Sequence, residues 1–411
     1  MARPKLTTIS LLVALGTLLY QSFLREALFV GIGLGRTIQP IKDFPFQCYR
    51  ITGDPNIQAC EDMWLDHESR TLYLACSDSE ARKHWMPNIH RLNATGRATD
   101  DRIVAMDIDN PTSTQSFTYR VLKPRGYSGV AGDGRIHVVG MTGTRSEDDS
   151  GQVNLWLINA RPSVDSETGQ VLDNTVVGGN HTIDVFSTKP GAVEMDHVQT
   201  FADVQIATPN NLAVTKSGGF FFTNDHGPHK VGWKHHLSLI LGTGDVSYCS
   251  KEGVCKLVSY GHKFPNGLHL GTDGLLYVPS AAVGGVKVYR PALDGSLTQV
   301  HHIRLDYPID NISEDANGDL YLATMPKGLE ALTPFDDPLN AATPPATVWR
   351  VRRLHRESQG EYEYELEKII EDRDGEMLPG MTTVIHDAVE FIHVGDGDSD
   401  FLANDDEMAS Y

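Results

Sequence analysis

Acid and amide side chains recur at the starts of predicted β-strands, and these residue types can bind a hard cation. The segment DNISEDANGDLYLAT, for example, opens with Asp310 and Asn311. Calcium takes about six to eight oxygen ligands from carboxylates, amide carbonyls and water. We therefore expect one calcium site, whose predicted ligands are Glu61, Asn210, Asn266, Asp310 and Asn311.

The composition of this ligand set suits calcium. Glu61 and Asp310 are carboxylates, and their combined charge balances that of one Ca²⁺. The cysteines and histidines do not show the ligand spacing of a zinc site. A single Asp or Asn at a strand start is usually a turn former, but agreement in four of six repeats favours metal binding.

Internal repeats predict the elements that bring these residues together. Each repeat consists of a short strand, a turn that usually contains glycine, and an apolar strand. Six such units, with no long periodic helix between them, predict an all-β fold, a six-bladed β-propeller; two β-sandwich domains are the alternative. In a propeller the first strand of each blade lines the central channel, so the strand starts converge on one axis. The units span residues 60–78, 127–141, 210–225, 266–280, 310–324 and 382–395.

The length and net charge of the chain limit its domain organisation and its binding partners. Its 411 residues, 40% of them hydrophobic, can form one large all-β domain. A net charge of −19 disfavours nucleic acid or an anionic membrane surface as partner and is compatible with cation binding. We expect the propeller over residues 36–395, with a strand within 357–372. Residues 396–411 are expected to form a solvated acidic tail rather than an EF-hand, because Phe401 stands where that loop needs glycine.

The N-terminal segment predicts entry into the secretory pathway. Residues 6–24 are uncharged and follow Arg3 and Lys5. We expect residues 1–35 to be an N-terminal hydrophobic anchor helix, an uncleaved signal anchor that holds the protein to the membrane with its domain lumenal or outside. A cleaved signal, giving a secreted protein, and a buried core helix are the alternatives. The glycosylation sequons at Asn93 and Asn180 fit this compartment.

The cysteines predict at least one disulfide. There are five, so at least one thiol is unpaired or pairs between chains. Cys249 and Cys255 bracket a short hairpin and are expected to pair in an oxidising compartment. Cys76, inside the apolar stretch LYLAC, is interpreted as a small buried apolar residue.

Four motifs resemble those of the paraoxonase/arylesterase family of calcium-dependent propeller hydrolases. They are CEDMWLD, ATPNNLAVTKSGGFFFTNDHG, FPNGLHLGTDG and IDNISEDANGDLYLATMPKG, and the resemblance covers about residues 45 to 330. It implies a catalytic calcium held by the same five residues derived above. It also implies a second, structural calcium at Asp62, position 211 and a backbone carbonyl near Tyr127. Asn211 stands where the family usually has Asp, so that site would lack one charge.

The sequence departs from the family at its catalytic histidine pair. The motif that would carry the first histidine reads KPRGYS, giving Arg125, and the second position falls near Met141. Arg125 stays protonated and cannot act as a base; it would instead select substrates with a negative group. The remaining candidates for base or nucleophile are Asp310 and His226. The cysteine that would pair with Cys48 to close the family's ring is also missing.

These observations favour a calcium-dependent hydrolase of carboxylic esters or lactones, an arylesterase-like enzyme in which calcium polarises the carbonyl group. The absent histidine pair leaves open a calcium-stabilised propeller that is a binding scaffold without catalysis. A propeller enzyme similar to strictosidine synthase is a further alternative, and it would not need the oxygen cluster.

Overall fold

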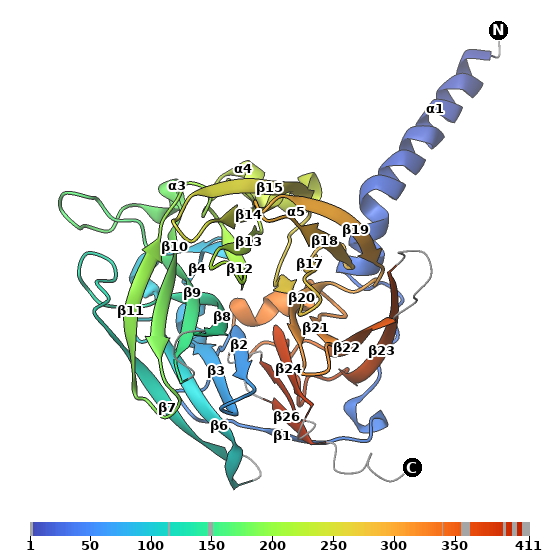
Figure 1. Cartoon of the computed structure of the whole chain (residues 1–411). Helices are drawn as coiled ribbons and strands as arrows, with labels where there is room; N and C mark the ends of the chain where they lie inside the picture. The colour runs from blue at the N-terminus through green and yellow to red at the C-terminus, as the bar shows by residue number, and fades with distance from the viewer. Residues whose placement is uncertain are drawn as a thin grey trace.

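The structure is an all-β, propeller-like assembly in which the sheets are arranged around a common centre (Figure 1). Continuous apolar runs in the inner strands are buried on both faces, and the core consists of apolar clusters between neighbouring sheets. The prediction of an all-β, propeller-like fold is confirmed. The computed structural model describes residues 3–113, 116–146, 151–338, 340–354, 362–388, 392–396 and 401–404.

Three sheets consist of four strands that are consecutive in sequence and antiparallel. Each begins with one of the predicted acid or amide segments. The first contains β12 (Pro209–Val214), β13 (Phe220–Asn224), β14 (Gly244–Cys249) and β15 (Cys255–His262). The second contains β16 (His269–Leu270), β17 (Leu276–Pro279), β18 (Val286–Pro291) and β19 (Leu297–Ile303). The third contains β20 (Ile309–Glu314), β21 (Leu320–Thr324), β22 (Ala346–Leu354) and β23 (Glu363–Asp372).

A larger sheet has eight strands, in the order β2-β3-β6-β7-β11-β10-β9-β8. Its two halves are antiparallel, and they join where β7 and β11 pair in parallel. The first half contains β2 (Asp62–Asp66), β3 (Thr71–Cys76), β6 (Arg102–Ser113) and β7 (Ser116–Arg125). The second contains β8 (Val138–Arg145), β9 (Val153–Arg161), β10 (Asn180–Thr188) and β11 (Glu194–Phe201).

The last sheet joins the two ends of the chain. The N-terminal strand β1 (Gln47–Arg50) pairs with β26 (Phe401–Asn404), so that Cys48 lies opposite Ala403. The other strands of this sheet are β24 (Thr383–Asp387) and β25 (Ile392–Asp396). Strand β26 lies within residues 396–411, which were expected to form a solvated tail. The sheets therefore extend beyond residue 395. A short apolar run, FLAN, forms this strand, and Cys48 has no disulfide partner within the described residues.

The expected hairpins are present in five of the six repeats, and the unit at 127–141 differs. Residues 127–137 form an irregular loop, and the first strand of that unit is β8, which pairs with β9. The loop contains glycines with positive φ at positions 129, 132 and 134. The carboxylate of Asp133 accepts hydrogen bonds from the backbone amides of Val130 and Arg135. This local bonding replaces a strand pairing there.

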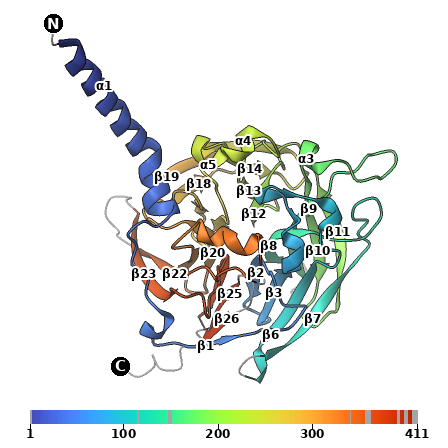
Figure 2. The same ribbon diagram turned by 180° about the vertical axis from the view of Figure 1, so that it is seen from behind.

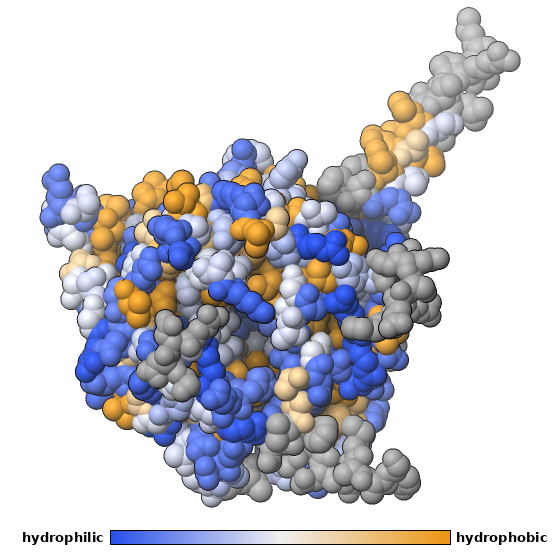
Figure 3. All heavy atoms as spheres, in the orientation of Figure 1, coloured by the Kyte–Doolittle hydropathy of each residue, from blue (hydrophilic) through white to orange (hydrophobic). Residues whose placement is uncertain are grey.

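The helices are few and mostly short. Helix α1 (Arg3–Leu19) projects away from the sheets (Figures 1 and 2), and its exposed leucines form an apolar stripe (Figure 3). In the described part of the chain, no helix is long and apolar enough to cross a membrane. The other helical segments are η1 (Tyr20–Leu24), η2 (Ala27–Gly31), η3 (Ile41–Asp43), α2 (Ser79–Arg82), η4 (Pro87–Ile89), η5 (Ala94–Gly96), α3 (Asn174–Val177), α4 (Trp233–His236), α5 (Ser238–Leu241) and η6 (Glu330–Phe335). The two-residue strands β4 (Trp85–Met86) and β5 (Arg91–Leu92) pair with each other.

The segment after α1 packs against the sheets. The carbonyl of Gly31 accepts a hydrogen bond of 2.9 Å from the amide of Gly328. The Arg36 guanidinium donates to the carbonyls of Asp306 and Pro326. The boundary that the sequence predicts at residue 35 therefore falls within a segment that is attached to the rest of the fold.

Two disulfides are present. Cys249 pairs with Cys255, as predicted, across the β14–β15 hairpin. The interpretation of Cys76 as an unbonded apolar residue is wrong, because Cys76 pairs with Cys60. The chain before β2 continues the pairing with β3, since the Glu61 amide donates to the Ala75 carbonyl at 3.1 Å. That pairing brings the two cysteines together and attaches the residue before Glu61 to the end of β3.

Candidate functional site

A cavity of about 520 Å³ lies where the strand starts meet. Four of the five predicted calcium ligands line it, and they lie in or just before the first strands of four different blades or half-sheets. Most of the other lining residues are apolar, including Ile240, Phe264 and Leu332. The short orange helix near the centre of Figure 2 is η6, which contributes to this wall. The four lining ligands are Glu61, Asn210, Asn266 and Asp310.

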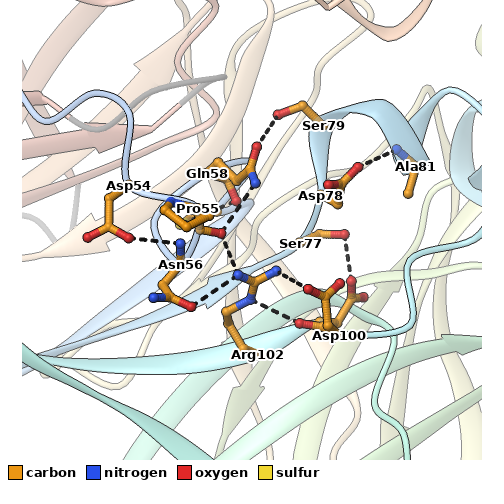
Figure 4. Close-up of polar contacts among 12 residues, drawn as sticks. Asp54, Pro55, Asn56, Gln58, Ser77, Asp78, Ser79, Ala81, Asp100 and Arg102 are labelled. Carbon is orange, nitrogen blue, oxygen red and sulfur yellow. Dashed lines mark hydrogen bonds and ion pairs between the residues drawn. The ribbon is translucent and has the colours of Figure 1, made fainter.

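Glu61 is held at the cavity by the loop that precedes β2. Figure 4 shows this loop, in which the Arg102 guanidinium donates to the Pro55 carbonyl and to Oδ1 of Asn56. The Asn56 amide in turn donates to the Asp54 carboxylate at 2.9 Å. On the other side, Nη1 of Arg82 lies 3.6 Å from Oε2 of Glu61. The loop, the Arg82 pair and the neighbouring disulfide together fix the position of this carboxylate.

Asp310 and Asn266 carry oxygen atoms that lack hydrogen-bond partners. Both side chains are buried, and the Asn266 amide group bonds Asp310. Oδ1 of Asp310 and Oδ1 of Asn266 have no partner among the described residues. Burial, followed by the charges of Glu61 and Asp62, raises the pKa of Asp310 well above its usual range. A buried carboxylate in this setting needs a proton or a cation.

Asp62, Asn211 and Asn311 form a second polar cluster beside the cavity, and its members bond one another. Nδ2 of Asn211 donates to Oδ2 of Asp62 at 3.0 Å and to Oδ1 of Asn311 at 2.9 Å. Asp62 also accepts from the amides of Met63 and Met141. The Leu212 amide donates to Oδ1 of Asn211, which fixes the orientation of that side chain. Burial raises the pKa of Asp62 to about 7, and the charge of Glu61 contributes.

The sequence predicts one group of five calcium ligands, but the structure separates Asn311 from the other four. Asn311 lies with Asn211 rather than on the cavity wall, and its Nδ2 donates to the Glu61 carbonyl at 3.3 Å. Tyr127 packs against Phe186 and His197, and the backbone groups that bond Asp62 belong to residues 63 and 141 instead.

His226 lies in the cavity wall with its ring held in place. Nε2 donates to the Asn88 carbonyl at 2.7 Å, and Nδ1 contacts the Ser238 hydroxyl. Burial lowers the pKa of His226 to about 4, so the imidazole is neutral at pH 7. Behind it, Asp225 accepts from Nδ2 of Asn88 at 2.6 Å, and burial raises the pKa of Asp225 to about 7.

The two positions that replace the family's histidines lie outside the cavity lining. Arg125 is exposed at the end of β7, where it pairs with Asp196 at 2.6 Å and with Glu194 at 3.2 Å. Arg125 therefore does not line the cavity, where it was expected to select anionic substrates, because its guanidinium is exposed at the point where β7 pairs with β11. Met141 takes part in the second cluster through its backbone amide.

Several functional candidates were not predicted from the sequence. Three further histidines, His90, His235 and His236, line the cavity, and two of them lie on the short helix α4. The ion pair between Lys263 and Glu26, with 2.7 Å between Nζ and Oε2, is also in the lining. In the sequence, only the charged stretch HKVGWKHH draws attention to His235 and His236. The positions of His90 and of the Lys263–Glu26 pair depend on tertiary contacts.

Two of the five described non-glycine residues with positive φ lie in the cavity wall. His90 and Phe264 line the cavity with φ values of 62° and 49°. Ala59, two residues before Glu61, has φ of 47°. Non-glycine residues with positive φ are held only where the surrounding structure compensates the cost, and such residues occur preferentially at functional sites.

The cavity cluster fits a hard cation. Its donors are carboxylate and amide oxygens, two of which lack partners in the described part of the chain. No group of three or more His, Cys, Asp or Glu residues among the described positions could hold a metal by itself. Amide oxygens therefore have to be part of any ion site here.

Comparison with known proteins identifies the same family as the motifs. The family model described as Arylesterase matches residues 163–360. Serum paraoxonase/arylesterase 1 of Mus musculus is 29% identical over 195 residues, which cover 44% of this chain and 53% of that protein. Serum paraoxonase/arylesterase 2 of Homo sapiens is 26% identical over 177 residues, 42% of this chain and 49% of that protein. The chain thus matches about half the length of these curated relatives.

Solved structures with similar shape include a gluconolactonase from Xanthomonas campestris. It is 15% identical with a TM-score of 0.43, covering 90% of this chain and 98% of that one. A glucose dehydrogenase is 10% identical with a TM-score of 0.46, covering 87% and 98%. The family assignment depends on the sequence matches. These matches confirm the predicted resemblance to the paraoxonase/arylesterase family.

Proposed function

We propose that this protein is a calcium-dependent hydrolase of carboxylic esters or lactones, built on a six-bladed propeller. One observation carries the proposal: Asp310 and Asn266 each have a side-chain oxygen without a partner among the described residues, and both line a mostly apolar cavity in a relative of arylesterases. The blade number follows if each half of the eight-stranded sheet counts as one blade beside the four four-stranded sheets.

The residues that would hold the ion are Glu61, Asn210, Asn266 and Asp310, with Asn311 bonded behind them. When bound, calcium supplies a Lewis acid that polarises the substrate carbonyl. A second, structural ion at Asp62 and Asn211 has less support, because the amide of Asn211 already bonds the Asp62 carboxylate.

The substrate proposed is an uncharged ester or lactone with an apolar portion. Phe264, Ile240 and Leu332 line the cavity and would bury that portion. Asp310, one of the two predicted catalytic residues, would orient the ion. His226, the other, would hold Asn88 through the Nε2 hydrogen bond. Since both residues have these tasks, the proton acceptor of the reaction would be a different residue.

The compartment proposed is the secretory pathway. The two disulfides support an oxidising environment. Both sequon asparagines, Asn93 and Asn180, are exposed and accessible for glycosylation. Attachment to a membrane through residues 1–35 stays a prediction, which partition of the full chain between membrane and soluble fractions after carbonate extraction would test.

The experiment is hydrolysis of a panel of aryl esters and lactones by the full chain, with excess calcium and again with a chelator. We expect turnover that disappears with chelator and with Asp310→Ala. Turnover that persists in chelator would contradict the proposal. The matched control is Asp294→Ala, which removes an exposed carboxylate far from the cavity lining.

A calcium-stabilised binding scaffold is the second candidate. The exposed position of Arg125 favours it, because the family's first histidine position is not part of the cavity. Absence of turnover, together with a calcium-dependent rise in Tm, would support the scaffold over the enzyme.

A further inference from the structure

Four histidines form part of the cavity wall, and they divide into two pairs. The first pair is structural: the rings of His226 and His235 stack with centroids 3.7 Å apart. Both are buried, and Nδ1 of His235 donates to the His229 carbonyl at 2.8 Å. Backbone and hydroxyl groups occupy both ring nitrogens of His226 and Nδ1 of His235, so these imidazoles are poorly placed to exchange protons with a substrate.

The second pair, His90 and His236, is differently placed. The ring centroids are 4.3 Å apart with an interplanar angle of 54°. His236 is exposed and His90 is half-buried, and both line the cavity. The His90 ring forms a hydrogen bond to the backbone of its own residue, and no hydrogen bond of the His236 ring is present among the described residues. A backbone bond of this kind occupies one ring nitrogen of His90, so the other can accept a proton in the cavity.

His90 has an energetically unfavourable backbone conformation. Its φ and ψ are 62° and 29°, in the left-handed region. The preceding turn is fixed by Asn88, whose Nδ2 donates to Asp225 at 2.6 Å and to the Pro209 carbonyl at 3.2 Å. A strained residue anchored by buried neighbours and directed into a cavity is a typical functional arrangement.

We propose that His90 is the proton acceptor of the hydrolytic reaction and that His236 is a positioning residue for its ring, an inference that rests on the proposed hydrolase function. A ring nitrogen of His90 takes a proton from water as the water oxygen bonds to the carbonyl carbon. The π electron pair moves onto the carbonyl oxygen. The bond to the leaving oxygen then breaks, and the imidazolium returns the proton to that oxygen. Water is the only co-reactant, and the products are an acid and an alcohol, or a hydroxy acid from a lactone.

The charged groups around His90 suit this role. Burial, then the neighbouring His236 and His226 rings, lower the pKa of His90, so its imidazole is neutral at pH 7. Arg91 follows it in sequence and is paired with Asp336. The other charged groups of the cavity wall are Glu61, Asp310 and the Glu26–Lys263 pair.

The test is a pH–rate profile of the full chain with calcium for wild type and three variants. His90→Asn keeps a residue that tolerates the left-handed region while removing the base. We expect kcat to fall about 10²–10⁴-fold with a smaller change in KM, loss of the acidic limb, and partial rescue by added imidazole. His236→Asn should lower kcat less and move the acidic limb to higher pH, because a neighbour that lowers the pKa of His90 is gone.

His229→Asn is the matched control, since this ring is in the same segment but outside the cavity lining. It should leave the profile unchanged. A His90→Asn variant that keeps the wild-type kcat and acidic limb would overturn the proposal while leaving the hydrolase intact. A wild-type protein without esterase or lactonase activity would overturn the hydrolase and this assignment with it. The calcium-dependent Tm shift of His90→Asn should equal that of wild type, which separates loss of the base from loss of the fold.

Discussion

Two polar clusters share the same strand starts yet differ in how their atoms are satisfied. In the cavity cluster, Oδ1 of Asp310 and Oδ1 of Asn266 lack partners among the described residues. In the neighbouring cluster, Asp62 accepts three hydrogen bonds, from two backbone amides and Asn211. Buried polar atoms without partners are costly, so the first cluster needs a ligand and the second does not.

The sequence doublets explain why both clusters exist. Residues 61 and 62, 210 and 211, and 310 and 311 are adjacent pairs, and successive side chains in an extended strand point to opposite sides. Glu61, Asn210 and Asp310 therefore face the cavity, while their successors meet one another. A single change, Asn at position 211, supplies an N–H donor where a second carboxylate would require a cation.

The largest expected effect is on the cavity cluster. Asp310→Ala should reduce kcat/KM for an ester or lactone about 10²–10³-fold, because a carboxylate at the proposed ion site is lost. The calcium-dependent rise in Tm should fall with it, since an ion that binds only the folded state stabilises that state. Differential scanning calorimetry with and without calcium checks the second effect. An unchanged calcium shift in this variant would show that the ion binds elsewhere.

Asn211→Asp tests the other cluster by restoring the missing charge. With chelator present, two buried carboxylates would face each other across the present 3.0 Å contact. We expect a loss of about 2–4 kcal/mol in the free energy of unfolding, recovered by millimolar calcium. Chemical denaturation in both conditions measures it, and Asn180→Asp at an exposed position is the control. A variant that is equally stable in chelator would mean that the second cluster is not closed as described.

Gly267→Ala would disturb the contact between the two clusters. A Cβ at position 267 would lie 1.8 Å from Oδ1 and 2.5 Å from Cα of Asn311, so backbone would have to move. We expect a loss of about 1–3 kcal/mol, measured by urea denaturation. Gly16→Ala, with nothing within 4 Å of the added carbon, should leave stability of the sheets unchanged. A neutral Gly267→Ala would argue that the Asn311 position is adjustable.

The pH dependence of the free energy of unfolding distinguishes the two polar clusters in the unmutated protein. The pKa values of Asp62 and Asp225 are raised to about 7 by burial. The folded state then binds protons that the unfolded state has released, so stability should fall as the pH rises from about 4 to 7. In chelator each group contributes a slope of up to about 1.4 kcal/mol per pH unit.

Calcium should reduce only part of that slope, because an ion in the cavity leaves Asp62 in its hydrogen-bonded setting. Thermal unfolding across this pH range, with and without calcium, measures the difference. A slope that calcium removes completely would indicate a second ion at Asp62.

Local sequence signals were sufficient for some parts of the molecule and insufficient for others. Alternating apolar residues and glycine turns predicted the hairpins of β12–β13 and β20–β21, and the oxygen residues at their starts were predicted with them. The position of Asn311 depends on which side of the strand faces Asn211, which residue type alone does not determine. The Cys60–Cys76 disulfide depends on strand register, and the histidine wall depends on loops from different sheets. These features arise from tertiary contacts between distant segments.

Arg125 provides the smallest expected effect and a control for the whole comparison. It is the charged residue at the family's first histidine position, yet it is exposed and forms an ion pair with Asp196 where β7 and β11 meet. Exposed ion pairs contribute about 0–1 kcal/mol, so Arg125→Gln should change the free energy of unfolding by less than that. Hydrolysis of neutral and anionic esters should keep the same ratio, because this guanidinium does not line the cavity. A variant with altered preference for anionic esters would place the substrate near β7, and would contradict the location of the site at the cavity cluster.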